Sequence, residues 1–127
     1  MASKLHERGL EMRKKVLGTA QVEQTLANTD KYSQPLQEMV NEYCWGAVWA
    51  RPGLEPRIRC MLTVAMLAAL NRPNHLKTHL RAALKNGVTR EEIMEILLHA
   101  NVYCGAPAAV DAFGSMRDVF AAIDAGA

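Results

Sequence analysis

The sequence predicts an all-α protein of six to seven helices. Apolar residues recur at three- and four-residue steps along almost the whole chain, and no stretch alternates as a half-buried strand would. Most of the eight glycines and five prolines stand where one helix would end and another begin. With 127 residues, half of them hydrophobic, the chain has the size and composition of one compact domain, residues 1–127.

The N-terminal quarter of the sequence predicts two helices. The first runs from about Lys4 to Leu17, with Ser3 as its N-cap and Gly18 as its end. The second covers about residues 20–27 and ends in the turn-forming sequence Asn-Thr-Asp.

A third helix is predicted to open at Ser33 and Pro35, because proline is favoured in the first helical turn. Its apolar residues fall on one face: Leu36, Met39, Val40, Tyr43 and Ala47. The segment Arg51–Pro56 ends it, since two prolines and a glycine cannot continue a helix.

Four further helices are predicted in the C-terminal half. They cover about residues 57–71, 73–86, 90–103 and 107–123. Gly87 ends the helix at residues 73–86. Thr89 and Glu92 form the S/T-x-x-E pattern of a capping box before the helix at residues 90–103.

The helix at about residues 57–71 is apolar on nearly every side after its first turn. A chain of this length has little material with which to cover such a helix, so we expect it to be buried between subunits of a homo-oligomer. The alternative is a monomer that wraps the helix with its own segments.

Composition restricts the partners and the compartment. A formal charge of +2 is too small and too evenly spread to favour nucleic acid or an acidic membrane as a partner. The longest apolar run, Cys60–Leu70, is about half the length of a membrane span. The polar start, Met1–Arg8, does not resemble a secretory signal. Three cysteines without a C-x-x-C motif fit a reducing compartment, and we expect a cytoplasmic protein.

Three arginines, Arg51, Arg57 and Arg59, surround the proline-rich turn and the start of the apolar helix. Guanidinium groups bind carboxylates through two parallel hydrogen bonds, so this cluster favours a small acidic ligand. The alternative is that these arginines only flank a surface turn.

His75 and His79 lie four residues apart and therefore on one helix face. No third ligand or intervening glutamate accompanies them, so we expect no metal site. His79 is a candidate acid or base because imidazole titrates near neutral pH, although a structural hydrogen bond is the alternative. Glu42 lies among apolar and aromatic residues and is a candidate buried carboxylate.

A second polar series recurs every four residues near the C-terminus. It consists of Glu91, Glu95 and His99, and we interpret it as a solvated helix face and not as a site.

Several motifs, in order along nearly the whole chain, resemble the 4-carboxymuconolactone decarboxylase family, part of the alkylhydroperoxidase D-like superfamily. They are Gly9-Leu10-Glu11-x-Arg13, Val16-Leu17-Gly18, Trp45-Gly46-Ala47-Val48-Trp49-Ala50-Arg51-Pro52-Gly53-Leu54, Arg57-x-Arg59, Ala69-Leu70, Leu76-x-x-His79-Leu80-Arg81-Ala82, Asn86-Gly87-Val88-Thr89, Glu92-Ile93-x-Glu95 and Tyr103-x-Gly105-x-Pro107-Ala108.

This resemblance implies the alkylhydroperoxidase D-like helical fold and a ring-shaped homo-oligomer, a trimer or hexamer. It implies a cofactor-free carboxy-lyase of the β-ketoadipate pathway of aromatic catabolism. The expected reaction converts 4-carboxymuconolactone, a small anionic lactone, into β-ketoadipate enol-lactone and carbon dioxide.

For this reaction our hypothesis is that Arg51 together with Arg57 or Arg59 binds the substrate carboxylates. His79 is expected to donate a proton or to stabilise the oxyanion. Glu42 would orient or tune His79, Tyr103 would donate a hydrogen bond, and Trp45 would form a wall of the site or part of the core.

A thiol-based alternative is a peroxidase or reductase of the wider superfamily. Redox members carry C-x-x-C shortly before the histidine that matches His79, whereas Asn71–His75 contains no cysteine here. Cys60 and Cys104 could support thiol chemistry only if they face one pocket. A third possibility is a paralogue that binds another small organic acid.

Overall fold

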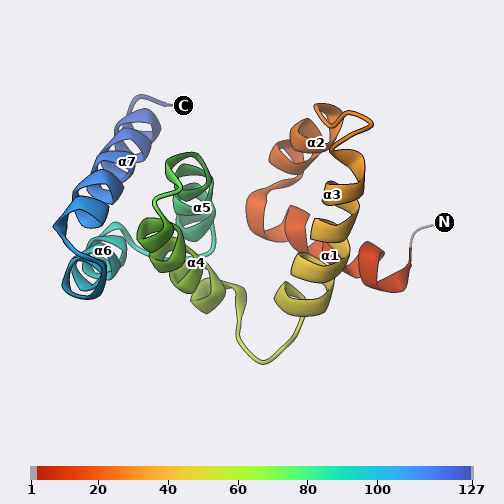
Figure 1. Ribbon diagram of the computed structural model, residues 1–127, viewed down its shortest axis with the longest axis horizontal. Coiled ribbons are helices and arrows are strands. Elements are labelled where there is room, and N and C mark those ends of the chain that lie inside the picture. Colours follow the sequence, from red (N-terminus) through yellow and green to blue (C-terminus); the bar gives the residue numbers. More distant parts are fainter. Residues whose placement is uncertain (1–2, 127) are drawn as a thin grey trace. The chain divides into compact units, whose positions relative to one another are not determined.

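The computed structural model describes residues 3–126, and every regular element among them is helical (Figure 1). The elements are α1 (Lys4–Leu17), α2 (Thr19–Ala27), α3 (Gln34–Met39), η1 (Val40–Trp49), α4 (Pro56–Leu70), α5 (Pro73–Lys85), α6 (Arg90–Cys104) and α7 (Ala106–Asp124). The predicted all-α fold is therefore confirmed, and the predicted ends lie within about two residues of the observed ones for most helices.

The cap residues explain these ends. The Ser3 hydroxyl accepts a hydrogen bond from the His6 backbone N–H at 3.0 Å, which satisfies one donor of the first turn of α1. The capping box of α6 is complete: Thr89 Oγ1 accepts from the Glu92 N–H at 3.0 Å, and Glu92 Oε1 accepts from the Thr89 N–H at 2.9 Å.

The third predicted helix differs from the expectation in its winding. After α3 the chain continues as η1, a π-helix, which ends with a hydrogen bond from the Ala50 N–H to the Trp45 carbonyl five residues earlier, at 2.9 Å. Hydrophobic spacing indicates which face of a helix is buried and does not specify the hydrogen-bond partner. The pattern could therefore not distinguish this wider turn from an α-helix.

The chain forms two units, an N-terminal unit up to Pro56 and a C-terminal unit from Arg57. In the N-terminal unit η1 packs closely against α1. In the C-terminal unit α7 packs against both α5 and α6 (Figure 1). The largest fully buried side chains of that unit are Leu76, Leu80, Ile93 and Leu97.

The apolar helix at residues 57–71 is α4, and it buries only one side. Cys60, Val64 and Ala68 are buried, whereas Met66 and Leu70 keep 60% and 62% of their surface exposed. Its burial in a homo-oligomer stays a prediction. No helix within residues 3–126 is long and apolar enough to cross a membrane.

Candidate functional site

A groove of about 700 Å³ lies on the C-terminal unit between α4 and α6. Its lining is mostly apolar, with Ile58, Met61, Leu62, Ala65 and Ile96. Glu91, Glu92, Glu95 and His99 supply its polar groups. An acidic, apolar groove of this kind is better suited to neutral or apolar surfaces than to a substrate with two carboxylates.

The groove gives a second role to the polar series at Glu91, Glu95 and His99. All three residues are exposed, as the sequence predicted for a solvated face, but they also line this groove. The His99 ring lies 5.0 Å from the ring of Tyr103, which is 77% exposed near the end of α6. Tyr103 therefore lies beside the groove and not in a closed pocket.

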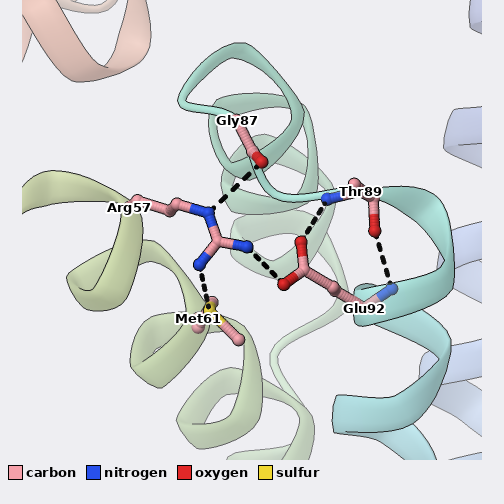
Figure 2. Close-up of polar contacts among 5 residues, drawn as sticks. All are labelled: Arg57, Met61, Gly87, Thr89 and Glu92. Carbon is pink, nitrogen blue, oxygen red and sulfur yellow. Dashed lines mark hydrogen bonds and ion pairs between the residues drawn. The ribbon is translucent and has the colours of Figure 1, made fainter.

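Arg57 lies in the first turn of α4 beside the groove, and its guanidinium group is held by protein partners (Figure 2). Nη2 forms an ion pair with Glu92 Oε2, and Nε donates to the Gly87 carbonyl at 3.3 Å. Nη1 approaches Met61 Sδ at 3.6 Å. Glu92 is at the same time the capping-box residue of α6, so this cluster joins the start of α4 to the start of α6.

The cluster predicts a pH-dependent stability. Hydrogen bonds from Arg57 and then from the Thr89 backbone hold the pKa of Glu92 below its usual range. A carboxyl group with a lowered pKa stabilises the fold above its unfolded pKa and loses that effect as the pH falls through the folded pKa. We expect Glu92→Gln to lower the melting temperature at pH 7.

Thermal unfolding of both proteins from pH 7 to pH 3 checks this expectation. The difference in melting temperature between the unmodified protein and Glu92→Gln should be largest at pH 7. It should shrink below about pH 4.3, the usual pKa of glutamate. A difference that stays constant over this range would show that ionisation of Glu92 does not stabilise the fold.

The remaining predicted binding residues differ in exposure. Arg51 follows η1 and is exposed, whereas Arg59 is half-buried within α4. His79 is half-buried on α5, and His75, one turn earlier, is exposed. The predicted site residues therefore come from both units, because Arg51 belongs to the N-terminal unit.

Two more predicted residues, Glu42 and Trp45, lie on η1 in the N-terminal unit. Trp45 is 5% exposed and stacks on Trp49 with ring centroids 4.6 Å apart, so it packs in the core of this unit. Glu42 is half-buried and accepts a hydrogen bond from the Ser3 hydroxyl at 3.2 Å.

The cysteines differ in environment and are all unpaired. Cys60 is fully buried, and burial raises the pKa of its thiol to about 11. At neutral pH this thiol is protonated and is a poor nucleophile. Cys104 is exposed at the end of α6, and neither residue lines the groove between α4 and α6. Within residues 3–126 no three His, Cys, Asp or Glu side chains are placed to hold a metal ion.

Residues 34–118 match the profile of the carboxymuconolactone decarboxylase family. The chain is 41% identical to 4-carboxymuconolactone decarboxylase of Acinetobacter baylyi over 115 residues, which cover 91% of this chain and 86% of that relative. It is 42% identical to nitrosuccinic acid decarboxylase of Metarhizium robertsii over 109 residues, which cover 86% of this chain and 76% of that relative.

Proposed function

Because the chain belongs to the carboxymuconolactone decarboxylase family, we propose that it decarboxylates 4-carboxymuconolactone to β-ketoadipate enol-lactone and carbon dioxide. One observation carries the proposal: the chain is 41% identical to a relative that bears this activity in its name. The alignment covers 91% of the chain. The family match at residues 34–118 also contains every residue to which we assign a role.

The substrate itself supplies the electron sink for this reaction. The bond between the ring carbon and the departing carboxylate breaks, and its electron pair moves through the alkene onto the lactone carbonyl oxygen. The resulting furan-olate then takes up one proton on carbon. The protein must hold the carboxylates, stabilise the oxyanion and deliver that proton.

We assign the carboxylates to Arg51 together with Arg57 or Arg59, because a guanidinium group binds a carboxylate through two parallel hydrogen bonds. His79 donates the proton or stabilises the oxyanion, since imidazole transfers protons near neutral pH. Glu42 supplies a carboxylate and Tyr103 donates a hydrogen bond.

The second candidate substrate is nitrosuccinic acid, because the relative that bears this name is as similar to the chain as the first. Loss of the carboxylate next to the nitro group moves the electron pair onto the nitro oxygens, and a proton then returns to carbon. The same set of groups serves both reactions, because each needs carboxylate binding, anion stabilisation and one proton.

We also propose that the protein is a homo-oligomer, a trimer or hexamer, in the cytoplasm. The exposed apolar side chains of α4 support association between copies, and unpaired cysteines suit a reducing compartment. Light scattering on the purified protein tests the first point, and a monomer at micromolar concentration would contradict it.

Turnover by the purified protein tests the function. The protein is supplied in separate assays with 4-carboxymuconolactone, with nitrosuccinate, or with hydrogen peroxide and a dithiol. Carbon dioxide is followed for the two acids and thiol loss for the peroxide, each against an enzyme-free control. We expect carbon dioxide from the lactone at a rate well above that from nitrosuccinate. Peroxide-dependent thiol loss without decarboxylation would favour the redox alternative.

Replacement of Arg59 tests carboxylate binding. We expect Arg59→Ala to weaken substrate binding by about 2–5 kcal/mol, which raises KM at least about 30-fold, because a desolvated charge pair is lost. Arg117→Ala on α7 is the matched control, since it removes the same charge from an exposed position. Steady-state kinetics measure both variants, and an unchanged KM in Arg59→Ala would remove Arg59 from the site.

A further inference from the structure

Arg13 on α1 is buried without a carboxylate partner. Only 7% of its surface is exposed, and no acidic side chain within residues 3–126 forms an ion pair with it. Its Nη1 donates to Gln37 Oε1 at 2.9 Å and to Asn41 Oδ1 at 2.8 Å, and its Nε has no hydrogen-bond partner. Burial lowers the pKa of Arg13, while the nearby Cys44 raises it. A positive charge is therefore held in the N-terminal unit by neutral amides.

Arg13 also fixes the direction of the two amides. A guanidinium group can only donate hydrogen bonds, so the side-chain oxygens of Gln37 and Asn41 must both face it. Their NH₂ groups consequently point away from Arg13. Asn41 Nδ2 lies 3.5 Å from His6 Nε2, and within residues 3–126 neither NH₂ group has another hydrogen-bond partner. The positive charge behind each amide polarises its N–H bonds and makes them better donors.

Gln37, Asn41 and His6 all line a cavity of about 390 Å³ in the N-terminal unit. Asn41 is only 3% exposed, and the buried Nδ1 of His6 has no partner. Leu10, Leu26 and Thr29 supply further parts of the wall. The cavity therefore has hydrogen-bond donors at one side, with an uncompensated positive charge behind them.

One acidic residue, Glu38, also lines the cavity, and its Oε1 accepts from Gln34 Nε2 at 3.3 Å. A second negative charge in the same space would be repelled by this carboxylate. The cavity is therefore suited to a ligand with a single negative charge and not to a dianion. Gln37 and Asn41 lie about one helical turn apart, so the two oxygens of one carboxylate can each accept from a different amide.

We propose that this cavity is a binding site for the carboxylate of a small monocarboxylic acid. The carboxylate accepts N–H bonds from Gln37 and Asn41, and its charge is balanced by Arg13 behind them. None of the residues of this site is assigned to decarboxylation, and the proposal does not depend on that assignment.

Calorimetric titration of the full-length protein with propionate, at constant ionic strength, tests the proposal. We expect saturable binding, and we expect it to persist in Arg59→Ala, which removes a residue of the proposed substrate site. At pH 8, where inorganic phosphate is largely dianionic, phosphate should bind more weakly than propionate. No saturable propionate binding, or tighter binding of phosphate, would overturn the proposal.

Asn41→Asp is the decisive variant because it keeps the shape of the side chain and gives Arg13 a carboxylate partner. The fold should be preserved, and propionate affinity should fall at least about tenfold, since one donor is lost and the charge is already balanced. Arg8→Gln is the matched control: it removes a positive charge from an exposed position of the same helix, and binding should be unchanged. Equal propionate affinity in Asn41→Asp and the unmodified protein would contradict the assigned site.

Discussion

Replacement of His79 by glutamine is expected to lower kcat at least about 100-fold while the protein stays folded. Glutamine keeps a hydrogen-bonding side chain of similar length but cannot transfer a proton near neutral pH. General acid catalysis typically contributes a factor of about 10² to 10⁴, which sets the size of the effect. His79 is half-buried on α5, so the change leaves the main core untouched. Steady-state kinetics with 4-carboxymuconolactone provide the measurement.

His75→Gln is the matched control, because His75 lies one turn earlier on the same helix and is exposed. It should retain the activity of the unmodified protein. Circular dichroism and light scattering on both variants separate lost chemistry from lost structure. Full activity of His79→Gln, or an equal loss in His75→Gln, would exclude His79 as the proton donor.

The helical fold was predictable because its signals are local. Ser3, Gly18 and the capping box at Thr89 and Glu92 each act within one helical turn, and the structure places all of them at helix ends. The π-helical winding of η1 was not predictable from hydrophobic spacing, because that spacing reports only which face is buried.

The site was less predictable, because its contacts join residues far apart in the chain. The sequence indicates Arg57 as a candidate ligand-binding residue and Glu92 as a helix-capping residue. It does not indicate that they form an ion pair, because 35 positions of the chain separate them. Arg13 belongs to the motif Gly9-Leu10-Glu11-x-Arg13, but no local pattern predicts its burial, since arginine is usually exposed and its partners lie 24 and 28 residues away. Composition and periodicity carry no information about such pairs.

Substitution of Gly9 by alanine is expected to destabilise the N-terminal unit by about 3 kcal/mol or more, at the upper end of the cost of overpacking. Helices α1 and η1 approach each other there with their backbones almost in contact. A methyl group on Gly9 would overlap the carbonyl oxygen of Asn41 and lie 2.6 Å from the backbone nitrogen of Gly46. Backbone atoms cannot move aside as the end of a flexible side chain can, so the two helices must separate.

Gly114→Ala on α7 is the matched comparison, because it introduces the same methyl group into the middle of a helix. Apart from the helix's own nearby backbone, no atom lies within 4 Å of that methyl group. Helix propensity alone then favours alanine, and we expect a gain of up to about 1 kcal/mol. Urea unfolding followed by circular dichroism measures both variants. If the free energy of unfolding falls in Gly9→Ala and rises in Gly114→Ala, close packing of α1 against η1 requires glycine at position 9. A stabilised Gly9→Ala variant would show that the two helices do not approach so closely in solution, and the cavity beside Arg13 would then be wider than the structure indicates.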